Sequence, residues 1–179
     1  MNRFTKLITT VLFILGIAML MNGVIAPTAS ADDIGLGLAK AVDVAAGNQA
    51  VALGVPMNIA VVDGGGRLVS FSRMDGAWKG SIDIAQAKAF TAMAFCNDNA
   101  SPVCANTAQL QSLVQPGGPL YGLQATNRKD GIVAFPGGVT LCKNGAPIGG
   151  LGVSGGSVDQ DQNVAAFAAA ANALTCPGQ

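Results

Sequence analysis

Residues 137–153 read GGVTLCKNGAPIGGLGV, and this stretch decides the fold. It holds two β-prone runs, 139–143 and 148–153, on either side of Asn144-Gly145. Because Asn-Gly readily adopts the two positive φ angles of a type I′ turn, the pattern predicts an antiparallel hairpin. A third β-prone run, 132–135, precedes the hairpin and predicts a further strand.

A helix is predicted on the C-terminal side of this hairpin. Ser157 and Gln160 have the spacing of a capping box, and acidic residues occupy the first turn. The apolar positions that follow recur at helical spacing and form one core-facing stripe: Val164, Phe167, Ala168, Ala171 and Leu174.

The N-terminal half predicts a second hairpin between two further helices. Its strands are residues 57–62 and 67–73, joined by DGGG. We expect Asp32 or Asp33 to cap the first helix and Ser81 to cap the second. Their apolar stripes are Ile34, Leu38, Ala41, Val42 and Ala45 in the first helix, and Ile82, Ala85, Ala89, Phe90 and Met93 in the second.

Together these elements predict an α/β fold of the α+β type, an antiparallel sheet of about five strands flanked by helices. Residues 32–179 are expected to form a single domain, long enough to bury a core. In the middle segment, 97–129, the sequence indicates only a short helix from Asn106 to Val114 and loops.

The composition excludes several kinds of chemistry. The chain has no histidine, so it cannot form a Ser-His-Asp triad, a Cys-His pair, a His-ligated zinc site or a His-ligated haem. It has ten Lys plus Arg and ten acidic residues. This balance argues against nucleic acid as a partner, because a phosphate backbone is usually met by clustered positive charge.

The first 31 residues are typical of a secretory signal peptide. Arg3 and Lys6 precede an apolar run, 7–21, and Ala29-Ser30-Ala31 matches a cleavage site. A membrane anchor would need about 20 apolar residues, and this run ends early. We therefore expect a secreted or periplasmic protein with no stable membrane anchor.

All four cysteines lie in the part that would be exported, where thiols tend to be oxidised. We expect two disulfides, Cys96 with Cys104 across a short polar loop and therefore Cys142 with Cys176, although three pairings are open. A zinc site is the weaker alternative, because the sequence has no C-x-x-C pair.

Several motifs resemble one known family. NIAVVDGGG at 58–66, RMDGA at 73–77, FPGGV at 135–139 and IGGLGVSGG at 148–156 are similar to the GlcG/HbpS haem-binding family, which includes the C-terminal domain of PduO. The resemblance implies a profilin-like sandwich that assembles into dimers or larger homo-oligomers. It also implies non-covalent haem binding in some secreted members. One departure is Asp161-Gln162, where the family usually has Asp-Glu.

One candidate site is the turn before the last helix. Residues 150–155 match G-x-G-x-x-G, but no parallel strand with an acidic residue follows, which excludes a dinucleotide fold. Ser154, Gly155 and Gly156 are expected to offer backbone N–H groups that bind a carboxylate or a haem propionate. A turn occupied only by water is an equal alternative.

The other candidate cluster follows the second strand. Arg73 can bind a carboxylate with two parallel hydrogen bonds, and Trp78 can stack on a flat ring. The alternative is an Arg73–Asp75 ion pair, with Trp78 packed against a neighbouring subunit. The expected ligand site lies where these residues meet the glycine turns, across a subunit contact, and comprises Arg73, Asp75, Gly76, Trp78, Gly137, Gly138, Ser154, Gly155 and Gly156.

Three functions are compatible with these features. The first is an exported protein that binds haem or a related tetrapyrrole; the C-x-x-C-H attachment motif is absent, so the haem would be held reversibly. The candidate iron ligands are Met57, Met74, Met93 and Tyr121. The second is an enzyme that degrades haem or processes a small acid, although no catalytic set of residues is recognisable. The third is an oligomeric accessory module for a membrane sensor. Binding is favoured.

Overall fold

The computed structural model describes residues 33–97, 104–126 and 131–179, which all belong to one compact unit, residues 31–179. The expected signal peptide lies outside the described residues. None of the described helices combines the length and the apolar character that crossing a membrane requires.

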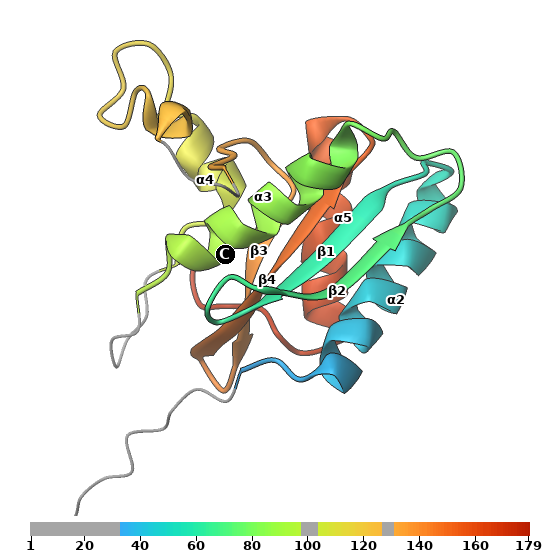
Figure 1. The fold of residues 1–179 in the computed structure, drawn as a ribbon. Helices are drawn as coiled ribbons and strands as arrows, with labels where there is room; N and C mark the ends of the chain where they lie inside the picture. The colour runs from blue at the N-terminus through green and yellow to red at the C-terminus, as the bar shows by residue number, and fades with distance from the viewer. Residues whose placement is uncertain (1–32, 98–103, 127–130) are drawn as a thin grey trace, which may run out of the picture. The chain divides into compact units, whose positions relative to one another are not determined.

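The described residues form an α+β fold with a four-stranded antiparallel sheet flanked by helices (Figure 1). The strand order is β2-β1-β4-β3. The fold class is as predicted, with four strands instead of about five. The elements are α2 (Leu36–Leu53), β1 (Asn58–Asp63), β2 (Leu68–Arg73), α3 (Ser81–Ala94), α4 (Thr107–Gln111), the 3-10 helix η1 (Leu123–Ala125), β3 (Gly138–Lys143), β4 (Ala146–Ser154) and α5 (Val158–Ala171).

Both predicted hairpins are present. Strands β1 and β2 pair antiparallel around the glycine-rich turn, and β3 and β4 pair around Asn144-Gly145. Asn144 has a φ of 53° and Gly145 a φ of 81°, the two positive angles that the dipeptide predicts.

The additional strand predicted at residues 132–135 is absent, because this segment bonds to a helix instead of to the sheet. The Val133 N–H donates to Thr91 Oγ1 of α3 at 2.9 Å, and the side chains of Ile132 and Ala134 are buried. Part of this β-prone run is therefore buried, as in a strand, but the segment pairs with none of the described strands.

Two predicted helix caps are wrong. Gly35 and Gly80, not Asp33 and Ser81, occupy the N-cap positions, and neither helix has a side-chain cap. Asp33 Oδ1 instead accepts a hydrogen bond of 3.0 Å from the Gly64 N–H in the β1–β2 turn. The predicted capping box of the last helix is confirmed: the Ser157 hydroxyl accepts from the Gln160 N–H, and the Gln160 side chain accepts from the Ser157 N–H.

The two faces of the sheet are covered by different helices. Ile59 and Val61 of β1 pack in a core with α2 and α5, whereas Ala60 and Val62 pack with α3. This division follows from the two-residue period of a strand, which sends alternate side chains to opposite faces. The result is three layers, with the sheet in the middle (Figure 1).

Helix α3 lies very close to the sheet because the strands beneath it present glycines. A Cβ atom on Gly152 would lie 2.0 Å from the Ala85 carbonyl oxygen, and one on Gly150 would lie 2.3 Å from that of Ala89. Gly138 meets the Lys88 carbonyl oxygen in the same way, at 2.6 Å. The backbone of α3 thus rests on a glycine platform, which we define as Gly138, Gly150 and Gly152.

The outer edge of β3 is closed by other parts of the chain. Its three outward N–H groups all have acceptors: Gly138 donates to Thr107 Oγ1, Thr140 to Gln179 Oε1, and Cys142 to the Leu174 carbonyl. Strand β2 forms the other edge of the sheet.

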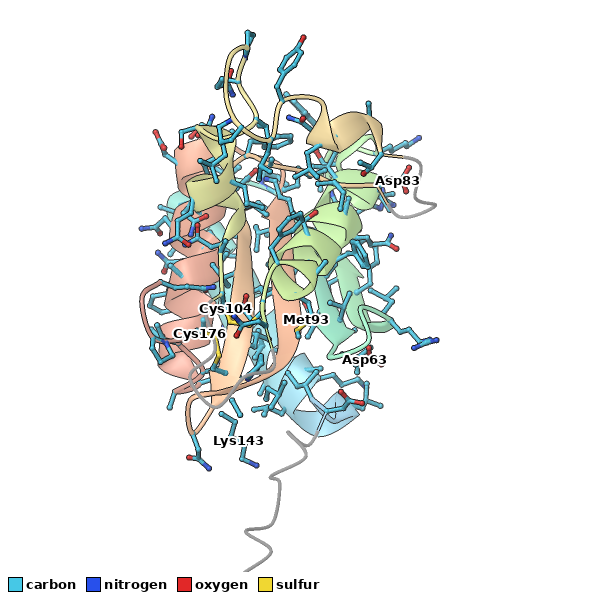
Figure 2. The ribbon with its side chains drawn as sticks, turned by 90° about the vertical axis from the view of Figure 1, so that its left-hand side faces the viewer. Asp63, Asp83, Met93, Cys104, Lys143 and Cys176 are labelled. Atoms are coloured by element: carbon cyan, nitrogen blue, oxygen red, sulfur yellow. A yellow bond between two sulfur atoms is a disulfide. The ribbon has the colours of Figure 1, made fainter. Side chains whose placement is uncertain are left out.

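The structure contains the disulfides Cys96–Cys104 and Cys142–Cys176, the pairing expected from the sequence. The second bridge ties the end of β3 to the C-terminal segment, and Figure 2 shows Cys104 and Cys176 close together on this side of the molecule. In the middle segment, the short helix is confirmed at Thr107–Gln111 with a cap at Asn106, and it ends three residues earlier than predicted.

The close packing of α3 predicts opposite effects of the same substitution at two glycines. Gly152→Ala places a methyl group against the backbone of α3 and should lower the free energy of unfolding by about 1–3 kcal/mol. Gly47→Ala, inside α2, meets only Ile59 at 3.8 Å and should raise it by about 0.4–1 kcal/mol. Urea unfolding measures both changes, and a Gly152→Ala protein as stable as the parent would contradict the platform.

Candidate functional site

The sheet topology brings the predicted site residues to one end of the sheet. Arg73 of β2 pairs with Asn58 of β1, which pairs with Ser154 of β4. Gly138 begins β3 at the same end. Because neighbouring strands lie about 4.8 Å apart, the edge strands β2 and β3, which carry Arg73 and Gly138, are separated by about 14 Å.

The predicted residues divide into an exposed group and a less accessible group. Arg73, Asp75, Gly76 and Trp78 are exposed at the end of β2 and in the loop that follows it. The glycine turns, by contrast, are buried or half-buried: Gly137, Gly138, Ser154, Gly155 and Gly156. A ligand can therefore reach the first group directly.

The expectation that the glycine turns offer unoccupied N–H groups is wrong. Asp161 Oδ1 accepts from the N–H groups of Gly155 and Gly156, at 3.1 and 2.9 Å. The Gly137 N–H donates to Gln162 Oε1 at 2.8 Å. Asp161 and Gln162 at the start of α5 therefore already accept the hydrogen bonds that a haem propionate was expected to accept.

Asp161 also forms a buried ion pair that sequence reasoning missed. Lys88 Nζ lies 2.7 Å from Asp161 Oδ2, with the lysine side chain fully buried and that of the aspartate 4% exposed. The ammonium group also donates to the Val153 carbonyl at 2.9 Å, and it lies 4.8 Å from the centre of the Phe135 ring. The pair links α3 to α5 and to the end of β4.

Burial lowers the pKa of Lys88 below its ordinary value, and the hydrogen bond and charge of Asp161 oppose this shift. A lowered lysine pKa is a known property of catalytic lysines. Here the side chain has no exposed surface and its contacts are internal, so the geometry assigns it a role in holding α3, α5 and the glycine turns together.

Gly137 is the residue that makes room for this pair. Its φ of 121° strongly favours glycine, and a Cβ atom there would lie 2.6 Å from Lys88 Nζ and 2.8 Å from the Asp161 Cβ. The PGG motif at residues 136–138 therefore has a structural role, because its middle position must be glycine. In the sequence, the signal for this contact was the presence of both the PGG motif and acidic residues in the first turn of α5.

Asn58 holds the loop that carries Trp78. Its Nδ2 donates to the Trp78 carbonyl at 3.0 Å and to the Ser154 carbonyl at 3.5 Å. Two carbonyl acceptors fix the orientation of the amide, and they leave Oδ1 buried without a hydrogen-bond partner among the described residues. Asn58 thus joins the exposed loop to the β4 end and retains one unused acceptor.

Of the two alternative contacts for the exposed group, the Arg73–Asp75 ion pair is not formed, and packing of Trp78 against a neighbouring subunit stays a prediction. Arg73 and Asp75, both within the described residues, form no ion pair, and the Trp78 side chain is 72% exposed. An exposed tryptophan and an exposed arginine at the same end of a sheet offer the two kinds of contact that a flat anionic ligand needs.

The candidate iron ligands differ in their accessibility. Met57 and Met93 are buried in the two cores, and Met74 Sδ accepts a hydrogen bond from the Met57 N–H at 3.3 Å. Tyr121, between α4 and η1, is 68% exposed. Met57 and Met93 therefore act as core residues, and Tyr121 is the accessible member of the predicted set.

A separate pocket lies at the β3 edge. Its volume is about 60 Å³, well below the roughly 300–1,000 Å³ of small-molecule sites. Its lining contains neither a charged residue nor an aromatic ring: Asn106, Val139, Thr140, Gln162, Ala166, Ala169, Thr175 and Gln179. It lacks both contacts that a tetrapyrrole with propionates would use.

The four cysteines do not form a metal site in this oxidised structure. The sulfur atoms of Cys104, Cys142 and Cys176 all lie within 4.8 Å of one another, a spacing that would suit a metal ion. Each is engaged in a disulfide, however, and thiolates, not disulfide sulfurs, are the usual metal ligands.

The fold and the motifs of its glycine turns define a small α+β domain related to haem-binding proteins. Residues 34–170 match the family described as haem degrading protein HbpS-like, and the chain belongs to this family. The resemblance seen in the sequence is thereby confirmed.

Two kinds of relative were found by sequence. An uncharacterised 15.0 kDa protein of Citrobacter freundii, from the dhaT-dhaS intergenic region, is 41% identical over 74% of this chain and 87% of its own length. The corrinoid adenosyltransferase PduO of Salmonella typhimurium is 40% identical over 71% of this chain. That match spans only 35% of PduO.

Solved structures share the fold over most of the chain. Protein ORFY of Klebsiella pneumoniae superposes with a TM-score of 0.72 at 34% identity, covering 84% of this chain and 98% of its own. A complex of PduOC with haem gives a TM-score of 0.68 at 36% identity, covering 78% and 94%. An HbpS variant from Streptomyces reticuli gives 0.66 at 28% identity, covering 80% and 89%.

The buried ion pair predicts a characteristic mutational pattern. Lys88→Met should lower the free energy of unfolding by about 3–5 kcal/mol, because it leaves the Asp161 carboxylate buried without its cation. The double variant Lys88→Met/Asp161→Asn should lose less, since it removes both charges while the Asn side chain still accepts from the Gly155 and Gly156 N–H groups. Urea unfolding of the two variants compares these losses, and a larger loss in the double variant would contradict a structural role for the pair.

Proposed function

We propose that this protein binds haem, or a related tetrapyrrole, reversibly and without a covalent link. Membership of the HbpS-like family and the similarity to the PduOC domain, whose complex with haem is known, support the proposal. The signal-peptide pattern of residues 1–31 supports action outside the cytoplasm.

The observation that carries the binding surface is that Arg73 and Trp78 are both exposed and both tied to Asn58, Arg73 by strand pairing and Trp78 through its carbonyl. Asn58 fixes the backbone of Trp78, so the indole ring projects from an anchored loop. Haem presents a flat apolar ring and two propionates. The indole can stack on the ring, and the guanidinium can bind a propionate through two parallel hydrogen bonds.

The two groups of predicted site residues have different roles in this proposal. Arg73, Asp75, Gly76 and Trp78 form the contact surface. The glycine turns at residues 137–138 and 154–156 act as its support, because Asp161 and Gln162 already occupy their N–H groups. The negative charge of a propionate is therefore met by an arginine side chain.

This surface covers only part of a tetrapyrrole. Small-molecule sites bury about 70–90% of a ligand, and an exposed tryptophan on a sheet end contacts one face of a flat ring. A second copy of the chain supplies the other face in our proposal, in line with the expected homo-oligomer. One haem would then be bound for every two chains.

Haem, when bound, supplies redox-active iron. Of the candidate ligands in the predicted set, Tyr121 has the accessibility to reach the iron. The ring and propionate contacts do not depend on this ligand. The proposal consequently predicts binding of a metal-free porphyrin as well, which separates the surface from the iron.

Hemin titration of the purified mature protein tests the surface. Arg73→Ala should weaken binding roughly tenfold or more, since a charge-assisted hydrogen bond contributes about 1.5–3 kcal/mol, and Trp78→Ala should also weaken it. Arg67→Ala is the matched control, because Arg67 is an equally exposed arginine at the opposite end of the same hairpin. The Soret band reports the affinity of every variant, and quenching of Trp78 fluorescence gives a second measure in the variants that keep this single tryptophan.

The outcomes of this titration are distinct. A parent protein without a saturable Soret shift would exclude haem binding. If Arg73→Ala and Trp78→Ala bind hemin with the same affinity as the parent and the Arg67→Ala control, the site lies elsewhere. An endpoint of one haem per chain, instead of one per two chains, would contradict the shared site.

A further inference from the structure

The four cysteines lie together at the β3 edge, and the proposed haem surface does not use them. The bridges come from four separate places: the end of α3, the segment before α4, the end of β3 and the C-terminal segment. Although the bridges are separate, the sulfur atoms of Cys104, Cys142 and Cys176 all lie within 4.8 Å of one another. Cys104 of the first bridge therefore stands beside both sulfurs of the second (Figure 2).

The two bridges differ in their access to solvent. Cys96 is partly exposed, whereas Cys104, Cys142 and Cys176 are 6%, 2% and 3% exposed. We call Cys96–Cys104 the outer bridge and Cys142–Cys176 the inner bridge. An external thiol can reach the outer bridge at Cys96, while the inner bridge is shielded from it.

We propose that the two bridges form a thiol–disulfide relay in which Cys104 carries reduction from the outer bridge to the inner one. A small dithiol reductant attacks the Cys96 sulfur, the outer bond breaks, and Cys104 leaves as a thiolate. This thiolate attacks Cys142 or Cys176, a new disulfide to Cys104 forms, and the other inner sulfur leaves as a thiolate. The second thiol of the reductant releases Cys96, so the reductant is oxidised and one protein disulfide is reduced.

The relay has a structural consequence at the C-terminus. The inner bridge holds the segment that covers β3, together with the hydrogen bond from the Cys142 N–H to the Leu174 carbonyl and those between Thr140 and the Gln179 side chain. Opening the inner bond removes the covalent part of this attachment. Reduction at the partly exposed Cys96 thereby loosens the C-terminal segment that covers the edge of β3.

Two single-cysteine variants test the relay. Cys96→Ser leaves an unpaired thiol at Cys104, next to the inner bridge. Cys104→Ser lacks the same outer bond but leaves the thiol at Cys96. Each protein is held at pH 8 for several hours, quenched with acid, unfolded and labelled with a maleimide; peptide mass mapping then locates the labelled cysteine and the remaining disulfide.

We expect labels at Cys142 or Cys176 and a new disulfide to Cys104 in Cys96→Ser, and a label confined to Cys96 in Cys104→Ser. Disulfide reshuffling takes seconds to hours, so several hours are sufficient. A label confined to Cys104 in folded Cys96→Ser would overturn the relay. So would equal scrambling in both variants, which would indicate unspecific exchange.

The parent protein provides an independent measurement that needs no substitution. Dithiothreitol is added in small steps, and the first species with two free thiols is isolated and mapped. The relay predicts a species that retains one disulfide to Cys104, with Cys96 and one inner cysteine labelled. If Cys96 and Cys104 are the only labelled residues while the inner bridge stays intact throughout, the relay is wrong.

Discussion

The close approach of α3 to the sheet is the constraint on which the rest of the structure depends. The glycine platform removes the layer of side chains that normally separates a helix from a sheet, so the two backbones touch. This proximity allows side chains of one layer to bond to the backbone of the other. Thr140 of β3 donates to the Ala92 carbonyl of α3 at 2.8 Å, and Lys88 of α3 reaches the Val153 carbonyl of β4.

The same approach explains why a fully buried lysine is tolerated. Lys88 of α3 reaches Asp161 of α5, and the Asp161 carboxylate joins this lysine to the turn at Gly155 and Gly156. The desolvation of both charges is offset by their mutual attraction, by the Val153 carbonyl and by the two glycine N–H groups. The backbone N–H groups that could bind an external anion are thus occupied by an internal carboxylate.

Local signals in the sequence were sufficient for most of the fold. The Asn144-Gly145 turn and the capping box of Ser157 depend on backbone angles that few residues adopt, and both are observed. The strand expected at 132–135 failed because a β-prone apolar run can be buried against a helix as well as in a sheet. The Lys88–Asp161 pair joins residues 73 positions apart, and no local pattern specifies such a contact.

For the candidate site, the sequence indicated residues that do lie at one end of the sheet, but it did not indicate which of their groups are already hydrogen-bonded. The register of Arg73, Asn58 and Ser154 follows from the two hairpins once the strand order is known. The strand order itself, which places β4 between β1 and β3, is set by packing across the sheet. Whether a backbone N–H is occupied depends on such packing, so the role of Asp161 could not be read from the turn sequence.

Because the edge of β3 is covered, a strand from another molecule could extend the sheet only beside β2. Thr107, Gln179 and Leu174 accept all three outward donors of β3, which leaves β2 as the edge with strand-pairing groups on its outer side. A sheet with two open edges can add copies without end, and fibres are the result. A sheet with one open edge can be extended once, by a two-fold contact between two β2 strands, after which no edge remains. Thr107 and the C-terminal segment thus cover one of the two edges at which a strand of another copy could pair.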